Sequence, residues 1–270
     1  MKKKDLLIVL FLATLFLNCI TVFCQESNRI SPDSVMHANS EKWKVKQNKG
    51  LFGLAKPEFG PYVTHEVAKL DSPVIKKKTK DSSWAGAEIT SSGTDIDISK
   101  FLTIEKTKFY RLLLGQQSDT AETVFSISSV SVEKKQTFLG KLLSKKDEGK
   151  DAVLDYSRDI SGIILTGIDE TPWNFFLDDY RSGSRQTAGN FHPSASISNG
   201  YLKNKTDSLY ITLFSRYEAD ITFVNSRGEH LAALKFKQNP VYMWIRNDIE
   251  ASYQQAIAAV FAVIIAIKDL

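Results

Sequence analysis

A fourteen-residue stretch from Gly167 to Tyr180 holds four carboxylates and four aromatic rings. The carboxylates form two adjacent pairs, Asp169 with Glu170 and Asp178 with Asp179. Paired carboxylates can divide the acid and base roles of a hydrolase between them, or they can hold a cation. The first pair precedes a Thr-Pro dipeptide, which is typical of a turn, and the second pair would form the polar end of a strand. We favour this structural interpretation and keep a carboxylate-dependent hydrolase as an alternative.

His192 is a further catalytic candidate, because it lies in a stretch rich in Gly, Ser and Asn where a loop could shape the mouth of a site. No two of the four histidines have the spacing of a metal-binding pair. The sequence also contains no nucleophile elbow, phosphate-binding glycine loop or dinucleotide-binding fingerprint. We therefore predict no catalytic residue, no metal and no cofactor, and we expect a protein that is not an enzyme.

After Trp84 the chain consists of short stretches rich in β-branched and aromatic residues, separated by Gly, Asp, Asn and Ser. Apolar residues alternate with others in several of these stretches, for example at Leu209, Ile211 and Leu213. The segment Ser226 to Glu229 is typical of a tight turn between two of them. The pattern predicts successive antiparallel strands.

The run from Ala256 to Ile267 is apolar on every side, so as a helix it must be enclosed by other parts of the protein. Its length of ~18 Å is well short of the ~30 Å core of a bilayer. A sheet that closes around this helix would hide it and remove both sheet edges. We therefore predict a closed antiparallel β-barrel around a central hydrophobic C-terminal helix. The alternative is an α+β fold in which the helix packs on an open sheet.

The start of the chain has the pattern of a signal peptide, because three lysines precede the apolar stretch Leu6 to Leu17 and polar sequence begins at Gln25. We predict cleavage before Gln25 and a periplasmic or secreted protein. Retention of the segment as an N-terminal membrane anchor is one alternative, and lipidation at Cys19 or Cys24 is another. The predicted division is a signal peptide at 1–24, an extended polar lead-in at 25–83 and the barrel domain at 84–270.

Four segments near the end of the chain carry a resemblance to a known family: Phe223 to Glu229, Leu231 to Phe236, Trp244 to Asp248 and Ala256 to Leu270. Together they resemble the end of tubby-like proteins, which include the phospholipid scramblases and plant LURP-one-related proteins. The resemblance covers about fifty residues and implies a barrel of about 12 strands around the C-terminal helix. It implies lipid handling only by analogy. The basic phosphoinositide-binding residues of tubby domains cannot be placed here, and Asp248 with Glu250 is too sparse for the calcium-binding segment of scramblases.

The formal net charge of +4 falls to about +2 when the first 24 residues are removed, which is too small to imply a nucleic-acid partner. We therefore predict an exported, non-enzymatic envelope protein that acts as a structural or interaction module of tubby-like fold. Its expected partner is another envelope protein or an anionic lipid. The first alternative is a lipid or small-ligand binding protein, and the second is the carboxylate-dependent hydrolase.

Overall fold

The structure is a computed structural model of the 270-residue chain. It describes residues 36, 38–49, 54–71, 75–90, 93–116, 119–137, 152–178, 199–213, 220–235 and 239–267. Asp179, His192 and the predicted signal segment lie outside the described residues.

Fourteen antiparallel strands and the C-terminal helix α4 make up the described part of the chain. They are β1 (Ser40–Lys44), β2 (Lys46–Lys49), β3 (Ala55–Phe59), β4 (Tyr62–Lys69), β5 (Ile75–Thr90), β6 (Gly93–Gln116), β7 (Asp119–Gln136), β8 (Ala152–Leu165), β9 (Trp173–Asp178), β10 (Asn199–Lys203), β11 (Ser208–Leu213), β12 (Asp220–Asn225), β13 (His230–Lys235), β14 (Tyr242–Arg246) and α4 (Ala251–Ala266).

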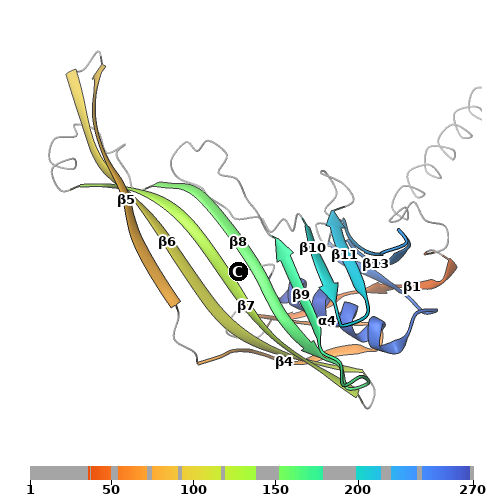
Figure 1. Cartoon of the computed structure of the whole chain (residues 1–270). Helices are drawn as coiled ribbons and strands as arrows, with labels where there is room; N and C mark the ends of the chain where they lie inside the picture. Colours follow the sequence, from red (N-terminus) through yellow and green to blue (C-terminus); the bar gives the residue numbers. More distant parts are fainter. Residues whose placement is uncertain are drawn as a thin grey trace, which may run out of the picture.

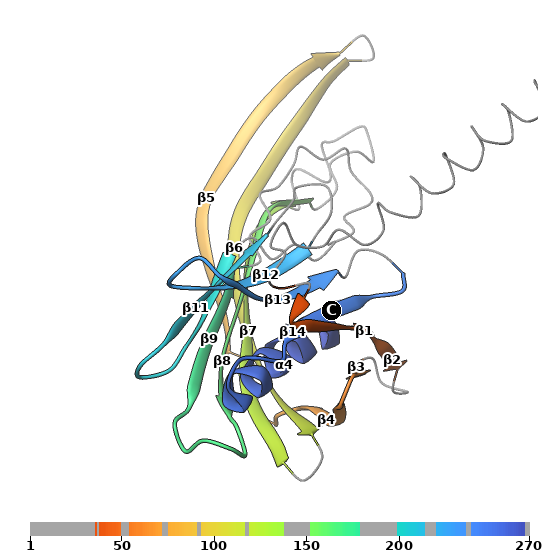
Figure 2. The same cartoon turned by 90° about the vertical axis from the view of Figure 1, so that its right-hand side faces the viewer.

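The strands form one sheet whose two ends are consecutive in the sequence. Thirteen strands follow the order β1-β14-β13-β12-β11-β10-β9-β8-β7-β6-β4-β3-β2, and β5 pairs with β6 beside this path. The terminal strands β1 and β2 are separated by Val45 alone, whose N–H donates to the Val241 carbonyl at 2.9 Å. One continuous segment therefore pairs with β14 through its first half and with β3 through its second half. This change of partner brings the sheet close to a closed barrel, which curves around α4 (Figures 1 and 2).

The predicted barrel around a hydrophobic C-terminal helix is confirmed, and the alternative of an open sheet is wrong. The barrel has twelve strands when β1 and β2, which form one continuous segment, are counted as a single strand and β5 is left out of the path. The start of the barrel differs from the prediction. Strands β1 to β4 all precede Trp84, and Val45, Phe59 and Tyr62 from this region are buried in the same core as α4. Strands β1 to β4, which lie in the predicted lead-in, are therefore structural parts of the barrel.

Helix α4 fills the inside of the barrel. Every residue from Gln255 to Ile267 is at most 2% exposed, so the helix has no face that contacts solvent. Phe261 packs edge-on against Phe223 of β12, with ring centroids 5.1 Å apart. Each large apolar side chain buried in this way contributes about 1.5–3 kcal/mol to the stability of the fold before conformational entropy is subtracted. Within the described ranges, no helix combines the length and apolarity needed to cross a lipid bilayer.

Strands β5 and β6 extend beyond the barrel as a long two-stranded ribbon (Figures 1 and 2). Pairing between β6 and β7 begins at Ser99 opposite Gln136, so the earlier residues of β6 pair with β5 alone among the described strands. The lysine-rich residues at the start of β5 thus belong to a strand with one described neighbour. Lysines on such an edge strand disfavour pairing with another chain.

Candidate functional site at one end of the barrel

The structure does not assemble the predicted pairs of carboxylates into one site. Asp169 lies in the connection before β9, where its Oδ1 accepts the Thr171 N–H at 3.0 Å. Asp178 lies at the far end of β9. At ~3.4 Å per residue, the strand places Asp178 about 17 Å from Trp173, where the connection that holds Asp169 ends. Asp178 faces Asp159 of β8 across the ladder, a neighbour that the sequence pattern did not indicate. Among the described residues, no three His, Cys, Asp or Glu side chains are placed to hold a metal ion.

Three other connections meet at the end of the barrel where α4 begins. They join β10 to β11, β12 to β13 and β14 to α4, and each is short. Consecutive antiparallel strands place every second connection at the same end of a sheet, and these three are adjacent because β10 to β14 are neighbours in the strand order.

Asn204 organises the connection between β10 and β11 with its side-chain oxygen. Asn204 Oδ1 accepts the backbone N–H of Thr206 at 2.9 Å and of Asp207 at 2.7 Å. Asparagine favours such turns because its side chain can replace a backbone acceptor. The Thr206 hydroxyl donates to Asp207 Oδ2 at 2.6 Å, so the Asp207 carboxylate is held in a fixed position.

Asn225 plays the same part in the connection between β12 and β13. Its Oδ1 accepts the N–H of Arg227 at 2.9 Å and of Glu229 at 3.0 Å, while its Nδ2 donates to Glu229 Oε2 at 2.6 Å. Gly228 has a φ of +81°, a conformation that residues with a Cβ rarely adopt. Arg227 Nη2 lies 3.4 Å from Glu229 Oε2, and the two side chains form an ion pair at the tip of the turn.

The connection from β14 to α4 is held by a second ion pair. Arg246 donates through Nε and Nη2 to the two carboxylate oxygens of Asp248, at 2.7 and 2.6 Å. This two-bond arrangement fixes the carboxylate more firmly than a single contact would. Gln254, in the first turn of α4, donates to the Ile249 carbonyl at 2.9 Å and so ties the helix to the connection.

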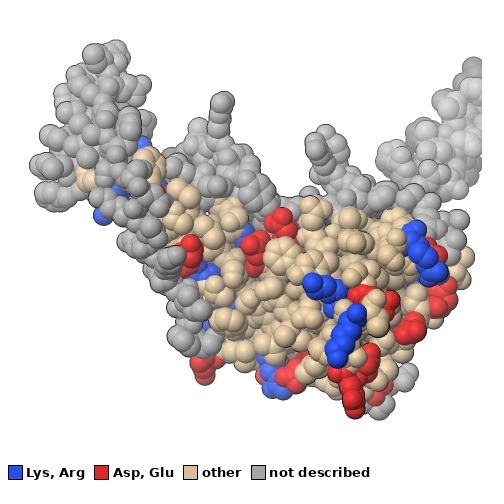
Figure 3. Space-filling view, in the orientation of Figure 1, with Lys and Arg blue, Asp and Glu red and all other residues tan. Residues whose placement is uncertain are grey.

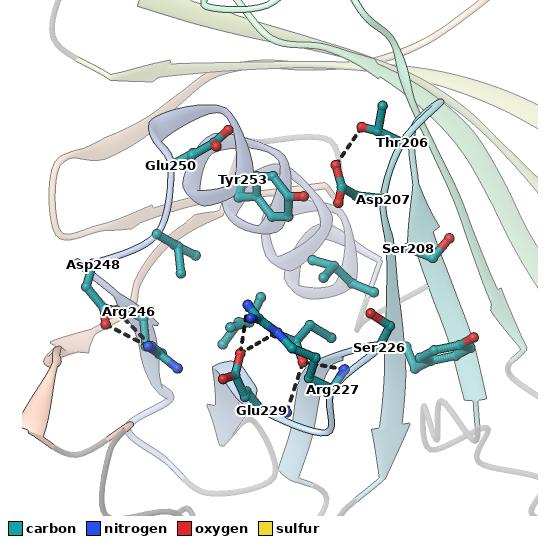
Figure 4. A pocket seen from close by; sticks show the side chains of 15 residues that line it. Thr206, Asp207, Ser208, Ser226, Arg227, Glu229, Arg246, Asp248, Glu250 and Tyr253 are labelled. Atoms are coloured by element: carbon teal, nitrogen blue, oxygen red, sulfur yellow. Dashed lines mark hydrogen bonds and ion pairs between the residues drawn. The ribbon is translucent and has the colours of Figure 1, made fainter.

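These three connections and the start of α4 enclose an open pocket of about 770 Å³ (Figure 4). The fifteen lining residues are Thr206, Asp207, Ser208, Leu209, Tyr210, Asn225, Ser226, Arg227, Glu229, Leu231, Arg246, Asp248, Ile249, Glu250 and Tyr253. Most of them carry a hydroxyl, an amide or a charge. Two arginines stand against four carboxylates, so the formal charge of the lining is −2.

Tyr253 connects the pocket to the barrel core. Its ring packs edge-on against the buried Trp173, with centroids 4.9 Å apart, and its hydroxyl points toward the Asp207 carboxylate (Figure 4). Loss of solvent, together with this contact to a carboxylate, raises the pKa of Tyr253. The hydroxyls of Thr206 and Tyr253 lower the pKa of Asp207, and the Arg246 guanidinium lowers the pKa of Asp248. Both carboxyl groups are therefore held in their ionised form, as hydrogen-bond acceptors.

Sequence patterns indicated the turns that build this pocket but not the pocket itself. Ser226–Glu229 was predicted as a turn, and the structure confirms it. Asp207, Arg246 and Tyr253 were not singled out as functional residues, because they are far apart in the sequence and become neighbours only when the barrel closes. The one available signal was the recurrence of asparagine with charged residues at the ends of strands.

We compared the chain with models of protein families, with curated proteins and with solved structures, and none of them matches it.

Proposed function

We propose that this protein is an exported, non-enzymatic binding module whose barrel-end pocket receives a polar partner from the cell envelope. The observation that carries this proposal is the pocket itself. It is open to solvent, and hydrogen bonds within the protein hold Arg246 and three of the four carboxylates, those of Asp207, Glu229 and Asp248, before any partner binds. Preorganised polar groups cost less conformational entropy on binding, which is how rigid sites gain affinity.

The electrostatics of the pocket support binding rather than hydrolysis. A general acid that works near neutral pH needs a carboxyl group whose pKa is raised by burial or by a neighbouring negative charge. The shifts of Asp207 and Asp248 go in the opposite direction, because each carboxylate accepts hydrogen bonds from neighbouring donors. These two groups are suited to accepting hydrogen bonds from a ligand and not to donating a proton.

The filled interior argues against storage of a lipid tail inside the barrel. Helix α4 occupies the space where such a tail would lie, and its residues from Gln255 onward are buried. A lipid partner would therefore have to bind through its headgroup at the surface. The formal charge of −2 in the pocket opposes an anionic headgroup, so the lipid-binding alternative receives less support than a neutral or cationic partner.

Export is the part of the proposal that rests on sequence alone, namely the lysines at positions 2–4 and the apolar stretch that follows them. We expect native protein to begin at Gln25, which N-terminal sequencing or an intact-mass measurement would show. A chain that still begins at Met1, or one that carries lipid on Cys19 or Cys24, would contradict cleavage at this point.

Blocking the pocket tests the binding function. Ser226 is exposed at the rim, so Ser226→Trp should fill the opening without disturbing the core. Lys108→Trp places the same side chain at an exposed position of β6 outside the pocket and serves as the control. The full chain and both variants would be immobilised and exposed to protein, lipid and glycan fractions of the native envelope. We expect one component to be retained by the parent and by Lys108→Trp and to be lost from Ser226→Trp. Equal retention by all three would refute the pocket as the binding site.

A further inference from the structure

A row of aromatic side chains crosses the outer face of the barrel and ends at the pocket. Phe176 of β9, Tyr201 of β10 and Tyr210 of β11 lie directly opposite one another in the strand register. The rings of Phe176 and Tyr201 are stacked, with centroids 5.8 Å apart and an interplanar angle of 24°. Tyr201 is 36% exposed and Tyr210 is 55% exposed. Tyr210 also lines the pocket, so the row and the pocket form one continuous surface.

The surroundings of this aromatic row combine neutral polar, apolar and charged groups. Ile163 of β8 is 48% exposed, and Asp178, two residues from Phe176 on the same face of β9, lies opposite Asp159. Ser161 continues the row onto β8 as the register partner of Phe176, and Asn174 and Ser208 are exposed on the two neighbouring strands. In Figure 3 the middle of the face formed by β8, β9 and β10 is largely free of charged side chains, which gather at its margins. Lys203 adds a positive charge beside the row, because its ammonium group lies 4.8 Å from the centre of the Tyr201 ring. Its long side chain is exposed, and an exposed contact of this kind is weak.

The combined surface has the chemistry of a sugar-binding site. The C–H face of a sugar ring packs well against an aromatic ring, and aromatic contacts contribute beyond the area they bury. Sugar hydroxyls both donate and accept, so they can use carboxylates, arginines, amides and hydroxyls at the same time. The pocket offers all four kinds of group, with its arginines already paired to carboxylates and a formal charge of −2. An anionic ligand is disfavoured by that charge, and an apolar peptide would leave the polar lining unpaired.

We propose that the ligand of this protein is a neutral polysaccharide chain that lies across Phe176, Tyr201 and Tyr210 and places its end in the barrel-end pocket. The inference rests on the proposed function and names the class of its ligand. Strands in a sheet are ~4.8 Å apart, so three rings in register span about 10 Å, which is enough to contact a short run of sugar units. The chain is bound and not cleaved.

Titration calorimetry with neutral hexasaccharides tests this inference on the full chain. The probes are cellohexaose, laminarihexaose, xylohexaose, mannohexaose and chitohexaose, and vesicles of phosphatidylglycerol and phosphatidylcholine provide a lipid arm. We expect at least one hexasaccharide to bind and the vesicles to give no signal. Tyr201→Ala and Tyr210→Ala should each weaken binding about tenfold, which corresponds to the loss of one aromatic contact. Tyr210→Phe keeps the ring and should stay within about threefold of the parent.

Two controls separate a loss of binding from a loss of fold. Val63→Ala changes an exposed apolar residue of β4 outside the row and should leave binding unchanged. The melting temperature of each tyrosine variant should stay within about 4 °C of that of the parent, because both side chains lie on the outer face and Tyr201 loses only its stacking on Phe176. Equal affinity of Tyr201→Ala, Tyr210→Ala and the parent would overturn the aromatic row as the binding surface.

The outcomes also distinguish this inference from the proposed function. If no hexasaccharide binds, the polysaccharide ligand is refuted. If an envelope component is nevertheless lost from Ser226→Trp, the pocket remains a binding site for another class of partner. Vesicle binding that depends on Ser226 would identify that partner as a lipid surface. If Ser226→Trp changes no interaction at all, both proposals fail.

Discussion

Asp207, in the connection between β10 and β11, faces the Tyr253 hydroxyl of helix α4 and accepts a hydrogen bond from the Thr206 hydroxyl. Its pKa in the folded state lies below its ordinary value, so the contact stabilises the fold when the carboxylate is ionised. We expect Asp207→Asn to lower the free energy of unfolding at pH 7 by up to about 1 kcal/mol, a small effect because Asp207 is only partly buried.

The sign of the pH dependence makes this prediction testable. Above pH ~4 the carboxylate is ionised in both states and the stabilisation is complete, whereas it is lost as the pH falls through the lowered folded-state pKa. The stability difference between Asp207→Asn and the parent should therefore shrink between pH 4 and pH 2 in urea unfolding. Glu170→Gln, at an exposed position outside the pocket, is the control and should stay within about 0.5 kcal/mol of the parent at pH 7. A difference that grows at low pH would contradict the assigned contact.

Thr123 differs from Asp207 because its side-chain hydroxyl has no hydrogen-bond partner among the described residues. It is fully buried in β7. Valine has nearly the same shape but no hydroxyl to desolvate. Thr123→Val should therefore be neutral or stabilise the protein by about 1 kcal/mol, measured as a shift of the urea midpoint. A loss above 1 kcal/mol would mean that Oγ1 has a partner, for example a buried water.

Individual turn residues could be predicted from the sequence, whereas their meeting point could not. The turn at Ser226–Glu229 has local causes, a positive φ at Gly228 and an asparagine that caps the backbone. Tyr253 faces Asp207 across the pocket only because the barrel places the start of α4 beside the connection from β10 to β11. Contacts of this kind depend on strand order, which is a property of the whole sheet.

Helix α4 was predictable because its apolarity on every side leaves one physical solution, enclosure by the rest of the protein. The strands at the start of the barrel gave a weaker signal. Ala55, Pro57 and Phe59 of β3 are buried while Lys56 and Glu58 alternate with them, but a strand of five residues with a central proline is a poor match to strand patterns. This explains why the predicted barrel began at Trp84 and the observed barrel begins at Ser40.

The enclosure of α4 predicts a large effect of a buried charge. Ile264 is 2% exposed, so Ile264→Asp would place a carboxyl group in the core with no partner. The cost of several kcal/mol is comparable to the whole stability of a typical domain, ~5–15 kcal/mol. We expect the full-length variant to unfold or aggregate, as shown by circular dichroism and size-exclusion chromatography.

Ala251→Asp is the matched control for this prediction. Ala251 is the first residue of the same helix and is exposed. An acidic residue in the first turn of a helix is favourable, so this variant should keep or slightly raise the melting temperature. A soluble Ile264→Asp protein that melts at the temperature of the parent would show that α4 does not hold the barrel together.

The sheet is brought close to a closed barrel by one segment that changes its pairing partner at Val45. This change of partner is the feature of the whole molecule that is hardest to predict from local sequence patterns. Residues on the two sides of Val45 pair with strands from opposite ends of the chain, β14 and β3. The outer face of β14 is covered in addition by Met36, which packs against Ala233 and Trp244. The N-terminal part of the described chain therefore belongs to the barrel and is not an accessory to it.

The ribbon of β5 and β6, by contrast, should contribute little to the stability of the barrel. The described residues from Ala85 to Ile98 pair only with each other among the described strands, and an isolated two-stranded hairpin is marginally stable in water. Ser83 pairs with Lys100, so residues 84–99 can be replaced by Asn-Gly to give a two-residue hairpin loop at the same register. We expect the melting temperature of this shortened protein to stay within about 4 °C of the parent, equivalent to about 1 kcal/mol.

A longer deletion, which cuts into the barrel, is the comparison for the shortened ribbon. Replacing residues 79–103 by Asn-Gly would also remove Leu102, which is 3% exposed, and the pairs that β6 forms with β7 from Lys100 to Thr103. Loss of a buried leucine alone costs about 2–5 kcal/mol, so this variant should melt well below the parent. Scanning calorimetry on the three proteins measures both effects. Equal destabilisation by the short and the long deletion would mean that the β5–β6 ribbon unfolds together with the barrel, as one cooperative unit.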